Sequence, residues 1–375
     1  MRLVVGAWVS PLVACALLGN GIVPSTPVSH AGIAREVAGG ASRPAATLLL
    51  VVQRGIRSAQ VQIGAGHDEI VAVADGHAQS IATGLTVPCC DLGGLAISPA
   101  GDRVVFSQEA KGATNANAGL WSITIDGHNV HRVIGPPTRR QTGSLDIGAV
   151  AWSSNQNIIA YAANRYSDGP VSAELEVDAG VWDAQSDGAG QRLVAPVVQQ
   201  GRFTPFVTKS CPGNVANPTI TNLSWGPQST TIIASVSCVV ATTSLLREED
   251  AVVAVDPRTG HVRVLAKNSR LGESGPISGK LAYVTNNAGS ERLWVAQPNG
   301  AGARSIIQSR TQIASLAWSP DERTVAFLER GVHQRSTVTF VDVGTGRVDT
   351  TLTISQLGIA MPASLERVTW LKGVK

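Results

Sequence analysis

The chain has 375 residues, a formal net charge of +3 and only 15% charged residues. Charge this sparse, without a basic run, excludes a nucleic-acid-binding surface of the usual electrostatic kind. The 39 glycines and 19 prolines favour frequent tight turns between short strands. No segment after Thr47 has the length and 3.6-residue period of an amphipathic helix, so we expect an all-β domain.

Residues 1–31 have the features of an export signal. An apolar stretch from Leu3 to Val23 follows Arg2, and Ser29-His30-Ala31 offers small residues around a cleavable bond. Residues 32–46 are rich in Gly, Ala, Ser and Pro, as in flexible linkers. The sequence therefore predicts an exported protein, periplasmic or extracellular, with a globular domain over 47–375.

The same segment contains a second signal, because Leu12-Val13-Ala14-Cys15 resembles the lipobox of bacterial lipoproteins. In such proteins the cysteine is lipidated, which would anchor the chain in the cell envelope. Apolar sequence continues beyond Cys15, whereas lipoproteins usually become polar there. Release after cleavage and a lipid anchor at Cys15 both remain open, and Pro11, Gly19, Asn20 and Gly21 within the apolar stretch argue against a permanent membrane span.

A short apolar strand, a tight polar turn and a strongly apolar strand recur along the chain. The copies are LAISPAGDRVVFS from Leu95, VAWSSNQNIIAYA from Val150, LSWGPQSTTIIAS from Leu223, ISGKLAYVT from Ile277, LAWSPDERTVAFL from Leu316 and the half-copy RVTWLK from Arg367. Self-similarity at a period of ~40–50 residues, with strand-forming residues in each unit, is typical of a β-propeller.

Six blades of four antiparallel strands are expected. The second to sixth cover 94–134, 148–195, 221–266, 276–308 and 314–352. Residues 47–84 supply only three strands, Leu48–Gln53, Glu69–Ala74 and Ala78–Thr83, and the C-terminal Arg367–Leu371 is predicted to complete that blade. This pairing closes the ring and removes a free sheet edge. Tryptophans at one repeat position are expected to fill the space between blades: Trp152, Trp225, Trp318 and Trp370.

The Trp-Ser-Pro-Asp turn followed by an apolar strand, best preserved in LAWSPDERTVAFL at 316–328, resembles the six-bladed propeller of TolB-type periplasmic proteins. Segments 95–107 and 292–307 resemble it less closely, and the resemblance covers about 47–371. Members of that family are envelope scaffolds that bind other envelope proteins. The resemblance therefore implies a non-enzymatic protein-interaction or ligand-binding module of the cell envelope, monomeric, with an envelope protein or peptide as its partner.

Four cysteines follow the signal segment: Cys89, Cys90, Cys211 and Cys238. An even number in an exported protein favours disulfides. Cys211 lies in the long connection that leads to the fourth blade and Cys238 ends a strand of that blade, so we predict a Cys211–Cys238 bridge. Cys89 and Cys90 form either a vicinal bridge or two free thiols.

The long connections are expected on one face, because they join either the second and third strands of a blade or the fourth strand and the next blade. Loops presented together by a rigid scaffold often carry function. Aromatic and basic residues are enriched at interface hot spots. The predicted partner contacts are Arg165, Tyr166, Arg202, Phe203 and Phe206.

Polar residues just ahead of the inner strands are predicted to form a ring at the mouth of the central channel: Asp91, Asp146, Glu273, Gln312 and Glu366. Converging carboxylates repel one another unless a cation neutralises them. The ring is therefore a candidate site for a divalent cation, the one cofactor considered, or for a basic peptide end. The competing interpretation is that these are ordinary turn residues facing water.

The ring also supports an alternative function, a lactonase-like propeller hydrolase with a metal at the channel mouth and a carboxylate as general base. Such metal sites also require Asn or His ligands that reach the axis, and Asn222 is the one candidate. No nucleophile elbow of the Gly-x-Ser-x-Gly type is present. No catalytic residue is assigned, and a non-enzymatic module is favoured.

Overall fold

The computed structural model of the chain describes residues 47–54, 67–74, 77–82, 92–108, 118–135, 144–154, 156–166, 179–199, 202–211, 215–241, 246–287, 289–331, 336–359 and 363–370. All of them belong to one compact unit, Arg43–Lys375. The predicted signal and linker over 1–46, with Cys15, lie outside the described residues, as do Cys89, Cys90 and Asp91.

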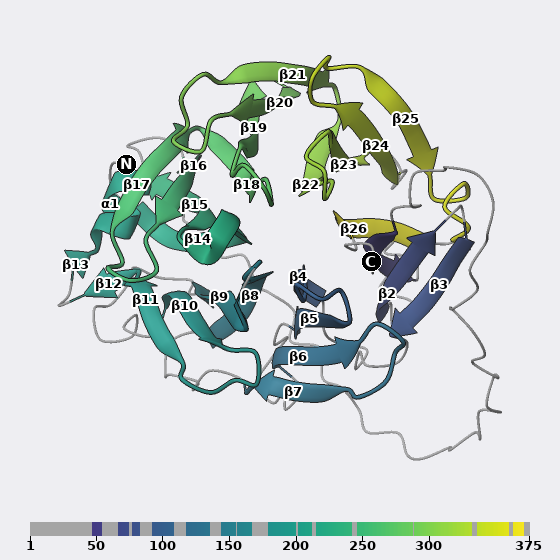
Figure 1. Ribbon diagram of the computed structural model, residues 1–375. Coiled ribbons are helices and arrows are strands. Elements are labelled where there is room, and N and C mark those ends of the chain that lie inside the picture. The colour runs from purple at the N-terminus through teal and green to yellow at the C-terminus, as the bar shows by residue number, and fades with distance from the viewer. Residues whose placement is uncertain are drawn as a thin grey trace, which may run out of the picture. The chain divides into compact units, whose positions relative to one another are not determined.

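Six four-stranded antiparallel sheets form the blades of a β-propeller, as the sequence predicts (Figure 1). We number the blades from the one that contains the first strand. Blade 2 comprises β4 (Leu92–Ile97), β5 (Arg103–Gln108), β6 (Gly119–Thr124) and β7 (His131–Ile134). Blade 3 comprises β8 (Ser144–Trp152), β9 (Ile158–Tyr166), β10 (Gly180–Gln185) and β11 (Arg192–Pro196).

The remaining complete repeats follow the same order. Blade 4 comprises β14 (Val215–Trp225), β15 (Ile232–Ala241), β16 (Leu246–Val255) and β17 (Val262–Lys267). Blade 5 comprises β18 (Ser269–Ser274), β19 (Leu281–Asn287), β20 (Ser290–Ala296) and β21 (Arg304–Ser309). Blade 6 comprises β22 (Gln312–Trp318), β23 (Thr324–Arg330), β24 (Ser336–Asp342) and β25 (Val348–Thr353).

Blade 1 unites the two ends of the domain. Its strand order is β26 (Ala363–Trp370), β1 (Leu48–Arg54), β2 (His67–Ala74) and β3 (His77–Ala82). Leu48 pairs with Trp370 and Arg54 with Ala363, and the side chains of Leu49 and Leu50 are fully buried. The predicted closure by the C-terminal strand is confirmed.

The inner strand of blade 5 was predicted near Ile277, and this prediction is wrong. The strand is β18, Ser269–Ser274, and the segment 275–280 forms the turn after it. Blade 4 approaches closely at Gly272, where a Cβ would lie 2.4 Å from Val252 Cγ1. An apolar side chain does not fit at this position, so the strand lacks the apolar pattern of the other repeats. The site residue Glu273 therefore lies inside a strand and not ahead of one.

Each inner strand has a register shift relative to the neighbouring strand of its blade. At the shift, backbone groups of the inner strand do not pair within the sheet. A polar side chain of the preceding blade binds that backbone. Leu92 N donates to Asp68 Oδ2 (2.7 Å), Ile220 N to Asn164 Oδ1 (2.8 Å) and Gly272 N to Ser235 Oγ (2.7 Å). These buried bonds connect successive blades near the axis.

The repeat-position tryptophans pack between blades, as predicted. The indole Nε1 of Trp225 donates to Ala151 O, that of Trp318 to Glu273 O and that of Trp370 to Ala317 O, each at 3.2 Å. Each bond runs from the last residue of one inner strand to the preceding blade. In these three residues a large apolar surface is therefore buried with its one polar atom satisfied, whereas the buried Nε1 of Trp152 has no hydrogen-bond partner among the described residues.

In the part of the chain that the structure describes, the strands are interrupted by α1 (Pro205–Ser210) and the 3-10 turn η2 (Pro227–Ser229). A two-stranded ladder of β12 (Val198–Gln199) and β13 (Arg202–Phe203) precedes α1. Across the described ranges, no helix has the length and apolar character needed to cross a membrane.

Candidate functional site in the central channel

A cavity of about 180 Å³ lies on the propeller axis and is lined by the inner strands of all six blades. The lining includes residues of the short turns that follow these strands, such as Ser98, Ser153 and Pro320. The cavity therefore lies toward the face that carries the short turns, and not toward the face that carries the long connections.

The inner strands can be aligned on their last residues, because the backbone N–H that follows each strand in blades 2 to 6 makes the same turn bond. The next-to-last residue of the inner strand then has a short side chain in five blades and a long one, Glu273, in blade 5. In blade order from 2 to 6 and then 1, these residues are Ala96, Ala151, Ser224, Glu273, Ala317 and Thr369. Two positions earlier stand Gly94, Ala149, Asn222, Leu271, Ser315 and Arg367. Glu273 and Arg367 are the charged residues among the described cavity lining.

Glu273 is held by blade 4. Asn222 Nδ2 donates to Glu273 Oε1 (3.0 Å) and to Gly272 O (3.1 Å), so the amide fixes both the carboxylate and its strand. Burial raises the pKa of Glu273 to about 7, although the bond from Asn222, the charge of Arg367 and a bond from Ser224 act in the opposite direction. At neutral pH this carboxyl group is therefore close to half-protonated.

The structure does not bring the predicted ring together. Asp146 and Gln312 stand six residues before the ends of their inner strands, Glu366 four and Glu273 one. At ~3.3 Å per strand residue, Glu273 is about 16 Å farther along the channel than Gln312, and it is the one ring member among the described cavity lining. Asp146 is buried, Gln312 is exposed, and Glu366 forms an ion pair with Arg330.

The metal ligands expected of such a ring are not assembled in the part of the chain that the structure describes. There, no three His, Cys, Asp or Glu side chains are grouped so as to hold a metal ion. At Glu273, the positive charge of Arg367, which acts on this carboxyl group, opposes a cation.

The predicted partner contacts are also separated by the structure. Phe206, on α1, is 1% exposed and lies in the core between blades 3 and 4, so the prediction that it contacts a partner is corrected. Proline at the start of α1 sets a turn whose buried side, Phe206 and Val207, packs inward. Phe203 is partly buried against the same core. The side chains of Arg165, Tyr166 and Arg202 lie outside the described residues.

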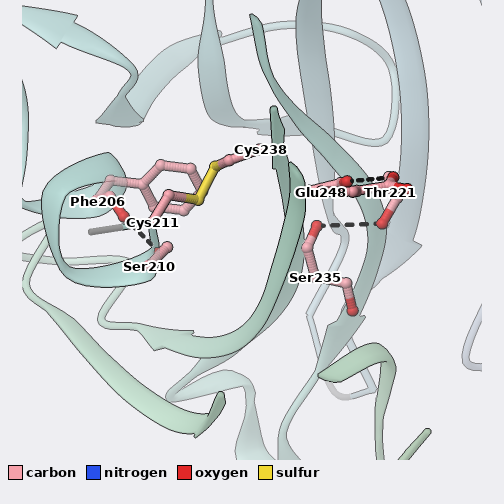
Figure 2. Close-up of a disulfide and its surroundings, with 8 residues drawn as sticks. Phe206, Ser210, Cys211, Thr221, Ser235, Cys238 and Glu248 are labelled. Atoms are coloured by element: carbon pink, nitrogen blue, oxygen red, sulfur yellow. Dashed lines mark hydrogen bonds between the residues drawn. A yellow bond between two sulfur atoms is a disulfide. The ribbon is translucent and has the colours of Figure 1, made fainter. Parts of the chain in front are cut away.

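The predicted Cys211–Cys238 disulfide is present (Figure 2). It joins the end of α1 to β15 across a Cα–Cα distance of 6.1 Å, and both cysteines are buried. Lys209 Nζ also donates to Val262 O of blade 4 (2.9 Å). The connection that leads to blade 4 is therefore attached to that blade by covalent and polar contacts.

Two functional features escaped the sequence analysis. Arg367 became visible as an exception only once the inner strands were aligned on their tryptophans, where its counterparts are short or neutral. The second feature is a latch, in which the Glu322 carboxylate of blade 6 accepts hydrogen bonds from Ile277 N (2.6 Å) and Ser278 N (2.7 Å) of blade 5. This latch presents Ile277, 66% exposed, beside the cavity-lining Pro276.

Comparison with known proteins gives short sequence matches and a broad structural one. No protein-family model matches the chain. The Tol-Pal system protein TolB of a Polaromonas species is 39% identical over 77 residues, which is 20% of this chain and 18% of that protein. The corresponding protein of Albidiferax ferrireducens is 36% identical over the same length and shares. The match thus spans less than a fifth of the length of these relatives.

Among solved structures, TolB from Acinetobacter baumannii superposes with a TM-score of 0.56 at 10% identity, over 87% of this chain and 66% of that one. Hydrazine synthase from Kuenenia stuttgartiensis gives 0.55 at 10% identity, over 88% and 47%. At this identity the likeness shows fold alone. The described domain is thus a six-bladed β-propeller. Its sequence match and its fold together make it a TolB-like propeller.

Proposed function

We propose that this chain is a non-enzymatic binding module of the cell envelope, exported from the cytoplasm, which binds an envelope protein or peptide. The observation that carries the proposal is the local identity to the Tol-Pal system protein TolB, together with the six-bladed fold. A propeller fold alone would not support it, because propellers serve many unrelated functions.

The partner surface is proposed on the face of the long connections. Strand order places all connections between first and second strands, and between third and fourth strands, on the opposite face, and these are short. By the same alternation, β1, β5, β9 and β11 end at the other face, where the long connections begin. Arg165 and Tyr166 lie at the end of β9, Arg202 and Phe203 form β13 between β11 and β14, and these four remain the proposed contacts.

Site-specific photo-crosslinking in cells that export the full chain tests this surface. A photoreactive phenylalanine analogue is placed at Phe203 and Tyr166, and at the exposed Arg258 and Pro298 in turns of the short-turn face, outside the cavity lining, as matched controls. We expect a discrete envelope protein to crosslink from the first pair alone, with the adduct identified by mass spectrometry. Equal adducts from both pairs, or from neither, contradict the proposed surface.

Fractionation of the same cells tests export and anchoring separately. The full chain is expected in the envelope fraction, and a chain that lacks residues 1–31 in the cytoplasm. Cys15→Ser distinguishes the two forms of export, because only a lipid-anchored protein would leave the membrane fraction on this change. Retention of the full chain in the cytoplasm would contradict the envelope role.

One observation favours the hydrolase as a second candidate. A carboxyl group with a pKa of about 7 in a cavity, as for Glu273, is suited to act as a general base near neutral pH. A lactone panel assayed with wild type and Glu273→Gln discriminates the two functions. Turnover that the variant loses would favour the hydrolase, and equal rates would remove it.

A further inference from the structure

We propose that the cavity in the central channel is a binding site for a carboxylate group, held by Arg367 and the polar side chains around it. This inference goes beyond the proposed function, because the cavity lies toward the short-turn face and not on the face proposed for the partner. The site takes either a small free carboxylic acid or the carboxyl terminus of a polypeptide, which share the same binding chemistry.

The shape and lining of the cavity fit a small organic ligand. Its volume of about 180 Å³ accommodates several groups the size of a water molecule, each of which needs ~10–15 Å³ on this measure. Apolar walls come from the last residues of four inner strands, Trp152, Trp225, Trp318 and Trp370. A few polar groups converge between them: Asn222, Ser224, Glu273, Ser315, Arg367 and Thr369. Polar atoms make up slightly more of the exposed lining than apolar atoms do, which suits a small polar ligand.

The two charged side chains decide the sign of the ligand. Arg367 keeps its proton at any accessible pH, so a cationic ligand meets its charge under all conditions. An anionic ligand meets the charge of Glu273 only while that carboxyl group is ionised. Among the described lining residues from the other inner strands, β4, β8, β14 and β22, none is charged. The site can therefore adapt to an anion but not to a cation.

The cost of this adaptation is small. Because burial raises the pKa of Glu273 to about 7, an appreciable share of the molecules already carries the proton at neutral pH, so the need for a proton on Glu273 weakens anion binding only slightly there. Protonated Glu273 then donates a hydrogen bond, and Asn222 Nδ2, which lies 3.0 Å from Glu273 Oε1, keeps the group in place. A guanidinium fork matches the two oxygens of a planar carboxylate.

Calorimetric titration of the full chain with sodium propionate tests the site. We expect saturable binding with proton uptake at pH 8, measured in two buffers of different ionisation enthalpy. Affinity should fall about tenfold per pH unit above pH 7 and level off between about pH 6 and pH 5.5, below which propionate itself takes up a proton. N-acetyl-trialanine as the free acid and as the amide distinguishes the sources. A chain-end site binds the acid at least tenfold more tightly than propionate and does not bind the amide, whereas a small-acid site prefers propionate.

Variants assign the roles of the two charges. Arg367→Gln should weaken propionate binding at least tenfold. Glu273→Gln should retain binding but lose both proton uptake and the pH dependence, because glutamine can donate the same hydrogen bond without titrating. Asp349→Asn, which removes a surface carboxylate on β25, is the matched control and should change neither.

If Arg367→Gln does not fold, the wild-type protein still decides the question. Carboxyl-detected NMR should then show that propionate raises the pKa of Glu273. The proposal is overturned if propionate does not bind, if binding releases a proton, or if ethylammonium binds and propionate does not. Crosslinking to an envelope protein at Phe203 does not depend on any of these outcomes, so the two proposals fail separately.

Discussion

Blades 5 and 6 are neighbours, and each consists of four strands in the same order. They differ in the residues at the last two positions of the inner strand. Blade 6 ends its inner strand with Trp318, whose indole bonds to the backbone of blade 5, and has Ala317 before it. Blade 5 has Ser274 and Glu273 at these positions. Regular repeat positions thus hold the ring together, and the departures from the repeat supply the polar groups of the channel.

The largest effect is expected from replacing the last residue of the inner strand in blade 6 and in blade 5. Trp318 is 7% exposed and packs in the core between blades 5 and 6. Trp318→Ala should therefore cost about 3–5 kcal/mol of unfolding free energy. Ser274→Ala removes one hydroxyl and should cost about 1 kcal/mol or less. Urea unfolding of both variants measures the difference, and equal losses would contradict the assigned roles.

The disulfide at blade 4, outside these two blades, is expected to have the next largest effect on stability. The Cys211–Cys238 bridge closes a loop over a separation of 27 residues, for which the chain-entropy model gives about 2–4 kcal/mol. The Cys211→Ala/Cys238→Ala double variant should lose this amount under oxidising conditions and be unaffected by a reductant. The pKa of Glu273, followed by NMR, should not change, because blade 4 holds Glu273 through Asn222 and not through α1. A shifted pKa would show that the channel depends on the bridge.

The third test concerns the ionisable carboxyl group of Glu273, which none of the other penultimate residues has. Its pKa of about 7 lies above the usual value of 4.5, so between these values the folded protein holds a proton that the unfolded chain has lost. Stability that this group contributes at low pH is therefore lost as pH rises to about 7 and changes little above it. Glu273→Gln should be about 1–3 kcal/mol more stable than wild type at pH 8 and equal to it near pH 4. Asp349→Asn, which removes a surface carboxylate of blade 6 outside the cavity lining, is the control.

The contrast between the blades also explains what the sequence could predict. Blades with an intact repeat were placed almost to the residue, as β5 at Arg103–Gln108 shows, because alternating apolar residues and a polar turn are local signals. The closure by β26 followed from a blade that was one strand short. The Cys211–Cys238 pair followed from the position of both cysteines at one blade.

Features without a local signal were misplaced. The strand β18 has the sequence SRLGES, in which Gly272 replaces an apolar residue because blade 4 approaches closely. This error moved Glu273 to the wrong level and created a ring that the fold does not form. The burial of Phe206 depends on α1, a helix of 6 residues that is too short to show a period.

The smallest test concerns the latch between the turns of the two blades. Glu322 adopts φ +55°, which costs a non-glycine residue about 1–2 kcal/mol, and its carboxylate offsets this cost by binding Ile277 N and Ser278 N. Glu322→Gln should lose about 1 kcal/mol, because the charge-assisted bonds become neutral ones. Glu322→Gly relieves the strain and removes the bonds, so its stability should stay near wild type while the amides of Ile277 and Ser278 exchange faster. Hydrogen exchange measures this directly: unchanged protection in Glu322→Gly would mean that the turn of blade 5 holds its shape without blade 6, and that the exposure of Ile277 is a property of that turn alone.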